Sequence, residues 1–255
     1  MKKGIIFSII IGLSSIMTWA IYTNSTNKSL SLKKDKEPKF ILSDTQRICI
    51  NEFLKIQKFY TKNKIFRANL FKSISPDGGT GEQMNIEVLA DGNYYFMDSK
   101  IGSVVNNDDF FAQIDYESNQ VVIGSPISQN PIGFKFKDFN KLFKDSLMEV
   151  SFKKNSDLAT ISYSNLIENT ITDISYHFLT GEIIRITETF YDYWEEEDEL
   201  TKITEDCIVR SFKPLSHPIS LTKFKLTDCL EQKDSVFLGK GICKGYEIED
   251  TRYKY

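Results

Sequence analysis

The order of apolar and polar residues predicts a helix at the start of the folded region. Ser43 and Gln46 have the spacing of a capping box, in which the two side chains bond the first free backbone amides of a helix. Apolar residues then recur at helical spacing on one face: Cys49, Phe53, Ile56 and Tyr60. We therefore expect a helix over about residues 44–61, with this stripe packed against a buried surface.

After the helix, apolar residues alternate with polar ones, which is typical of half-buried antiparallel strands. Short connections such as Asp91-Gly92 and Thr180-Gly181 indicate tight turns between consecutive strands. The sheet is therefore expected to be a meander. The alternation predicts strands at residues 66–70, 84–90, 94–97, 110–116, 121–123, 148–152, 158–163, 170–178, 183–191 and 202–212.

One helical segment interrupts the strands. Phe139, Leu142 and Phe143 have helical spacing and predict a short helix at about 138–143. Helix, strands, helix and strands in this order indicate an α+β fold. We expect a strongly curved antiparallel sheet, a half-barrel, with helices packed against one face.

The stretch PDGGTGEQ at residues 76–83 has the glycine content of a phosphate-binding loop. Such a loop needs a helix behind it, whose first amides hold the anion. Here Met84–Val88 alternates as a strand, and no lysine follows the glycines. The sequence therefore predicts a hairpin connection, in which glycine permits positive φ angles.

The N-terminus has the layout of a secretory signal. Lys2 and Lys3 precede an apolar run, and small residues follow at Thr18 and Ala20. The alternative is an uncleaved anchor at 4–22, just long enough to span a bilayer at about 1.5 Å per residue. Both place the domain outside the cytoplasm, as a periplasmic or secreted protein or on a membrane anchor. We expect a signal or anchor at 1–20, a flexible linker at 21–42, the half-barrel domain at 43–212 and an extension with two cysteines at 213–255.

Charge and composition exclude several classes of function. A net charge of -3 and a pI of about 5.6 lack the basic surface that nucleic acids require. Neither His177 nor His217 has a serine or cysteine nearby in a nucleophile setting. The acidic run 195–199 lacks the ligand spacing of a calcium loop, and Asp108-Asp109 lies in turn-forming sequence. We expect no enzyme activity, no metal and no cofactor.

An exported chain is expected to form disulfides from its four cysteines, which allow three pairings. A zinc site is the alternative, but the chain has no Cys-x-x-Cys pair. Cys229 and Cys243 enclose a short glycine-containing segment, so we predict a local bridge between them. Cys49 and Cys207 remain for a second bridge, which would join the opening helix to the last strand.

The order of these elements resembles the periplasmic lipoprotein-carrier superfamily, the half-barrel carriers and their lipoprotein-sorting relatives. The resemblance spans about residues 43–212: an exported N-terminus, the opening helix, the meander to residue 123 and the paired strands at 174–186. Members bind acyl chains in an apolar concavity and have no catalytic residues. The resemblance implies an exported, non-catalytic binding protein of the cell envelope that carries a lipid or a lipoprotein acyl chain.

The inward positions of the predicted strands would line such a concavity. They are Phe66, Leu70, Ile86, Val88, Phe110, Ile114, Ile174 and Tyr176. Alternation assigns these residues to one face and leaves open whether that face is hollow or filled. A filled face would favour the alternative function, a membrane-tethered structural or assembly protein that docks an envelope protein on its sheet.

Overall fold

The computed structural model divides the chain into two compact units. It describes residues 42–77, 79, 81–127, 148–165, 169–193, 200–220, 226, 228–233 and 236–252. The first unit consists of residues 1–58, 74–81 and 135–206. The second unit consists of residues 59–73, 82–134 and 207–255. One helix and two strands contribute residues to both.

Helix α2 (Asp44–Lys62) begins where the capping box predicts. The backbone N–H of Ser43 donates to Gln46 Oε1 at 2.8 Å, and the N–H of Gln46 donates to Ser43 Oγ at 3.2 Å. Both side chains thus satisfy amides that the helix itself leaves unbonded. The predicted stripe is buried at all four positions: Cys49, Phe53, Ile56 and Tyr60.

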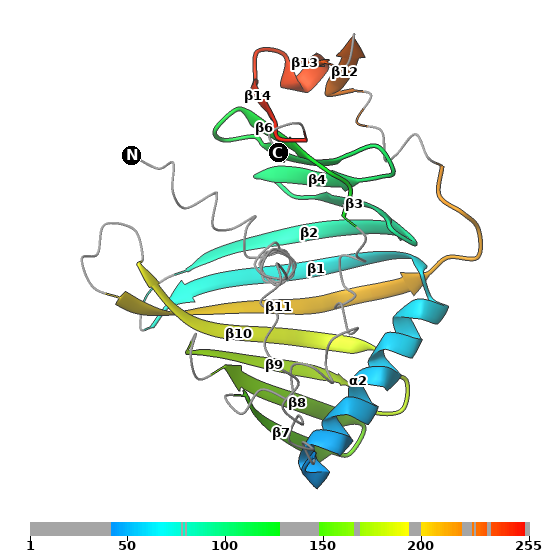
Figure 1. Ribbon diagram of the computed structural model, residues 1–255, viewed down its shortest axis with the longest axis vertical. Helices are drawn as coiled ribbons and strands as arrows, with labels where there is room; N and C mark the ends of the chain where they lie inside the picture. The colour runs from blue at the N-terminus through cyan, green and yellow to red at the C-terminus, as the bar shows by residue number, and fades with distance from the viewer. Residues whose placement is uncertain are drawn as a thin grey trace, which may run out of the picture. The chain divides into compact units, whose positions relative to one another are not determined.

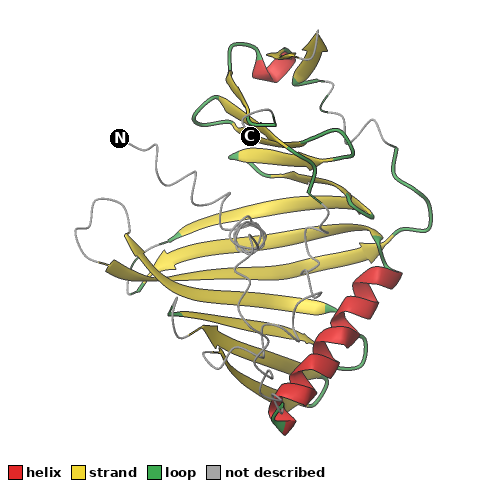
Figure 2. Ribbon diagram, in the orientation of Figure 1, coloured by secondary structure: helices red, strands yellow, loops and turns green. Residues whose placement is uncertain are grey.

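The first unit is an antiparallel meander with α2 lying across its strands (Figure 1, Figure 2). The strand order is β11-β10-β9-β8-β7. The side chain of Cys49 contacts β7, that of Phe53 contacts β8 and that of Glu52 contacts β9, so the helix crosses all three strands. The strands are β7 (Met148–Asn155), β8 (Leu158–Asn165), β9 (Thr170–His177), β10 (Ile183–Tyr193) and the first part of β11 (Leu200–Pro214).

The second unit contains a longer meander and the C-terminal segment, in the strand order β14-β6-β5-β4-β3-β2-β1-β11. Strand β14 (Glu247–Asp250) pairs parallel with β6, and β12 and β13 form a separate hairpin followed by the short helix η3. The other elements are β1 (Ile65–Pro76), β2 (Glu82–Asp91), β3 (Tyr94–Asp98), β4 (Gly102–Asn106), β5 (Phe111–Asp115), β6 (Gln120–Gly124), β12 (Leu230–Lys233), β13 (Val236–Gly239) and η3 (Gly241–Cys243).

The α+β fold class and its curved, unclosed antiparallel sheet are confirmed. Every strand that the alternation predicts is observed. Among strands β1 to β11, the prediction misses β4. Strand β4 is buried on both faces, so its sequence has no alternation to detect. The predicted helix at 138–143 and the acidic run 195–199 lie outside the described residues.

The glycine-rich stretch at 76–83 joins β1 to its neighbour β2, so the hairpin interpretation is confirmed. The two predicted tight turns are also present, with Gly92 at φ +66° and Gly181 at φ +84°. These two glycines differ in their surroundings. A Cβ on Gly181 would lie 2.9 Å from the carbonyl oxygen of Lys55, whereas a Cβ on Gly92 would meet nothing within 4 Å. The turn between β9 and β10 therefore touches the backbone of α2.

We predict that Gly181→Ala destabilises the protein more than Gly92→Ala does. Both changes place a Cβ at positive φ, which costs about 1–2 kcal/mol. Gly181→Ala also forces the turn away from α2, adding about 1–3 kcal/mol of overpacking. Urea denaturation of both variants measures the difference in unfolding free energy. Equal losses would show that the close approach to the helix has no energetic weight.

Candidate functional site

The inner face of the first unit is apolar beneath α2. The register pairs Ile161 with Ile174, and Tyr176 with Ile183, so these four side chains form adjacent rows on one face. All four are buried. Phe53 of the helix packs edge-on against Tyr163 of β8, with ring centroids 6.3 Å apart. We call Ile161, Ile174, Tyr176 and Ile183 the helix-covered face.

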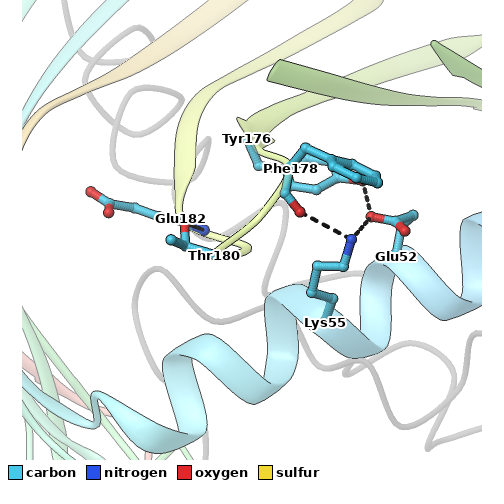
Figure 3. Close-up of polar contacts among 6 residues, drawn as sticks. All are labelled: Glu52, Lys55, Tyr176, Phe178, Thr180 and Glu182. Carbon is cyan, nitrogen blue, oxygen red and sulfur yellow. Dashed lines mark hydrogen bonds and ion pairs between the residues drawn. The ribbon is translucent and has the colours of Figure 1, made fainter. Parts of the chain in front are cut away.

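A polar cluster fastens α2 to this face (Figure 3). The Tyr176 hydroxyl donates to Glu52 Oε2 at 2.7 Å, and Lys55 Nζ donates to the same oxygen at 2.6 Å. Lys55 Nζ also donates to the backbone carbonyl of Phe178 at 3.0 Å. Burial, then the hydrogen bond and charge of Glu52, raise the pKa of Tyr176 far above its usual value. Tyr176 therefore remains a neutral donor, and the cluster fixes the helix directly over β9.

The same inner face becomes polar farther along the strands. Tyr163 and Glu188 are the cross-strand partners of Thr172, on either side of it. Burial raises the pKa of Tyr163 to about 12, with a hydrogen bond from Thr172 acting against the shift and the charge of Glu188 adding to it. Ile186, Glu188 and Phe190 of β10 are partly exposed. The inner face thus passes from a buried apolar end to a partly accessible end that carries both polar and apolar side chains.

Four of the eight predicted concavity residues lie on β1 and β2 of the second unit, and all four are buried: Phe66, Leu70, Ile86 and Val88. Phe66 packs against Phe212, with ring centroids 4.9 Å apart, and against Tyr60. Lys72 follows on the same face of β1 and is only 2% exposed. Sequence reasoning missed this buried lysine, although its inward position in the alternation was a signal for it.

Phe110 and Ile114, two further predicted residues, are covered by the chain's own C-terminal segment. They belong to one buried cluster with Leu230, Phe237 and the cysteines that follow β11. The rings of Phe110 and Phe237 meet edge-on at 5.4 Å. At β5 and β6 this side of the sheet is therefore packed by protein. The last two predicted residues, Ile174 and Tyr176, lie beneath α2.

The cysteine predictions are half right. Cys229 and Cys243 form the predicted bridge, but Cys49 and Cys207 are not bonded to each other. The Cys49 thiol donates to the carbonyl of Ser151 on β7, at 3.7 Å. Strand β11, which holds Cys207, is four positions from β7 in the strand order, or roughly 19 Å at about 4.8 Å per strand. A disulfide needs Cα atoms within about 7 Å.

The other candidate residues from the sequence are either exposed or take part in turns. His177 and His217 are exposed. Asp108 accepts a hydrogen bond from the Tyr94 hydroxyl, and the Asn107 side chain caps the backbone amides of the next turn, as expected of turn sequence. Among the described residues, no group of histidine, cysteine and acidic side chains has the arrangement to hold a metal ion.

Comparisons with known proteins find resemblance only among solved structures. No family model and no curated protein matches the sequence. The chain is similar to an uncharacterized conserved protein from Thermus thermophilus, with 10% identity and a TM-score of 0.42 over 77% of this chain and 98% of that one. A DUF1329 family protein from Desulfovibrio piger is 8% identical, with a TM-score of 0.39 over 72% and 98%.

A LolA superfamily protein from Nitrosomonas europaea is 7% identical, with a TM-score of 0.35 over 70% of this chain and 97% of that one. A LolA superfamily protein is thus among the solved structures to which the chain is similar.

We predict that the two cysteines outside the disulfide, Cys49 and Cys207, differ in reactivity. Burial, followed by the charge of Glu52, raises the pKa of the Cys49 thiol to about 11. Iodoacetamide at pH 8 should label the half-exposed Cys207 in the native protein and label Cys49 only in denaturant, as peptide mass spectrometry would show. Equal labelling of the native protein would contradict the packing of Cys49 under the helix.

The raised pKa of Cys49 also predicts that the unfolding free energy depends on pH. The unfolded chain releases the Cys49 proton at about pH 8.5, whereas the folded protein keeps it to about pH 11. The contribution of Cys49 to the unfolding free energy therefore falls as pH rises through this window. Cys49→Ala, compared with wild type by denaturation at several pH values, should show a shallower fall.

Proposed function

We propose that this protein is an exported, non-catalytic binding protein of the cell envelope that holds an amphipathic lipid or acyl chain on the inner face of its first unit. The observation that carries the proposal is the gradient along that face. Apolar side chains lie buried under α2, and Thr172 and Glu188 follow towards a partly accessible end. A ligand with an apolar tail and a polar head has matching halves.

The exposure of side chains along β10 supports this interpretation. Ile183 at the start of β10 is buried, whereas Ile186 and Phe190 on the same inner face are partly exposed. The inner face therefore becomes accessible along β10 with increasing distance from the β9–β10 turn.

The cellular location follows from the predicted signal. The apolar segment at 4–22 lies outside the described residues. Within the part of the chain that the structure describes, no helix is both long and apolar enough to cross a membrane. The Cys229–Cys243 disulfide is consistent with export to an oxidising compartment.

One observation favours the second function, a membrane-tethered assembly or structural protein of the envelope. The C-terminal segment packs the side of β5 and β6 where Phe110 and Ile114 were expected to line a concavity. A unit filled in this way offers a stable surface for docking another protein and has no need of a ligand. The two functions therefore differ in whether the first unit takes up an acyl chain.

We predict that Ile186→Trp weakens binding of a fluorescent fatty acid probe. Ile186 lies on the inner face opposite Ile174, so the larger ring would occupy the space of an acyl chain. Thr189→Trp on the same strand is the matched control, because Thr189 pairs with the exposed Ile171 on the outer face. We expect a loss of about tenfold or more, which is 1.4 kcal/mol, for Ile186→Trp and little change for the control.

Native mass spectrometry of the wild-type protein should also detect co-purifying lipid. Absence of both lipid and probe binding in the wild-type protein would refute the carrier function and leave the assembly function.

We predict that the mature chain begins at about Ile21, because two lysines, an apolar run and small residues precede it. Intact-mass measurement of protein isolated from its native envelope fraction gives the N-terminus directly. A full-length chain that stays in membranes through carbonate washing would instead establish residues 4–22 as an anchor.

A further inference from the structure

Strand β7 lies at the edge of the sheet in the first unit (Figure 1). It pairs with β8 over its whole length, from Met148 opposite Asn165 to Asn155 opposite Leu158. No strand among the described residues pairs with its other side. An edge strand presents a row of backbone N–H and C=O groups along that side, to which a further strand can bond. The edge of β7 is therefore a position at which another chain can extend this sheet.

The side chains of β7 follow a symmetric order. Val150 and Phe152 point to the inner face and are partly exposed. Glu149, Ser151 and Lys153 point to the outer face and are exposed. The outer residues are thus negative, neutral and positive in turn, with Ser151 at the centre. An order of this kind is complementary to itself when a second copy of the strand runs in the opposite direction.

The two outer charges have no counterpart on the neighbouring strand. The register places Glu149 opposite Ser164 and Lys153 opposite Thr160, and both of these β8 residues are neutral. Within the part of the chain that the structure describes, neither Glu149 nor Lys153 forms an ion pair. Cross-strand partners are what stabilise charges on a sheet. The packing of a single chain therefore gives no reason for this order of charges.

A second copy of β7 supplies the missing partners. When two copies run antiparallel with Ser151 opposite Ser151, each Glu149 faces Lys153 of the other copy. Each Val150 then faces Phe152 of the other copy, so the partly exposed apolar residues also meet. A shift of two residues in either direction places a charged residue opposite Ser151 and removes both charge pairs. The charges thus select one register.

The same comparison distinguishes β7 from an edge that is protected against pairing. A lysine on an edge strand ordinarily keeps other strands away. Here the glutamate at the symmetric position turns Lys153 into a partner for a second copy. Helix α2 reaches β7 on the inner face, where Cys49 contacts the Ser151 carbonyl, whereas the charge pairs form on the outer face.

We propose that two copies of this chain associate through β7 and form a dimer with one continuous antiparallel sheet. The two-fold axis passes between the two Ser151 residues. Each copy contributes the same edge, so the contact is isologous and closes at two chains. Strand β7 shares no residue with the helix-covered face, and the test of the dimer is therefore separate from the test of acyl-chain binding.

Charge reversal tests the dimer by sedimentation velocity of the exported protein, in detergent if the chain remains anchored. The wild-type protein should dimerise as its concentration rises. Glu149→Lys alone and Lys153→Glu alone each create two like-charge pairs, so each should weaken the dimer about tenfold or more. The double variant with both changes should dimerise as the wild type does. An equimolar mixture of the two single variants should also dimerise, because the lysines of one face the glutamates of the other.

Lys202→Glu is the matched control, because it makes the same change of net charge as Lys153→Glu at an exposed position of β11. It should leave the dimer unchanged. Recovery of the dimer in the mixture shows that both single variants are folded. A wild-type protein that stays monomeric up to about 1 mM would overturn the proposal. So would species larger than a dimer, or single variants that dimerise as well as the wild type.

Ser151→Cys tests the register. Opposed Cα atoms of an antiparallel pair lie about 4.5–5.5 Å apart, which a disulfide can bridge. Air oxidation should therefore join two copies through the introduced thiols, as peptide mass spectrometry would show. Ser162→Cys is the matched control, because Ser162 lies opposite Ser151 on β8, one strand farther from the contact, and it should not cross-link. Equal cross-linking of the two variants would refute the pairing of β7 with its own copy.

Discussion

The first unit depends on the packing of one amphipathic helix, α2, against the inner face of an antiparallel meander. Each large side chain that α2 buries contributes about 1.5–3 kcal/mol relative to exposure, and this interaction is not directional. Glu52 and Lys55 add directional contacts, because they form hydrogen bonds with Tyr176 and with the Phe178 carbonyl. Gly181 allows the β9–β10 turn to lie directly against the backbone of the helix.

In the second unit, a different element covers the apolar side of the sheet. Its strands β5 and β6 also present an apolar side that must be covered, and the covering element is the hairpin of β12 and β13 with its disulfide. The short β14 then pairs with β6 and satisfies the backbone groups of that strand. A segment that follows the last long strand of the meander is thus part of the packing of this unit.

Polar groups on inner faces distinguish this chain from a simple filled core. Lys72 in the second unit and Thr172 and Glu205 in the first are all buried. Burying such groups costs free energy unless they are hydrogen-bonded or paired, so hydrophobic packing alone gives no reason for their presence. In the first unit, Thr172 pairs with Tyr163 and Glu188 across the strands, so polar groups lie next to the part of the face that becomes accessible.

The sequence by itself determined the elements whose causes are local. The capping box and apolar stripe determined α2, and period-two alternation determined the strands that are buried on one face. Glycines at the turns determined the hairpins, because only local backbone geometry decides them. The face to which Phe66 or Ile174 points also followed from alternation.

Only the tertiary structure decided what depends on distant partners. Strand β4 has no alternation because neighbours cover both of its faces. The thiol of Cys49 lies over β7, which excludes Cys207 as its partner, and no spacing in the sequence encodes the strand order that separates them. The element that covers each inner face also depends on the tertiary structure. Helix α2 covers Ile174, and Phe237 covers Phe110. Burial is a property of the packed partner, and a pattern along the chain specifies only the side on which that partner must lie.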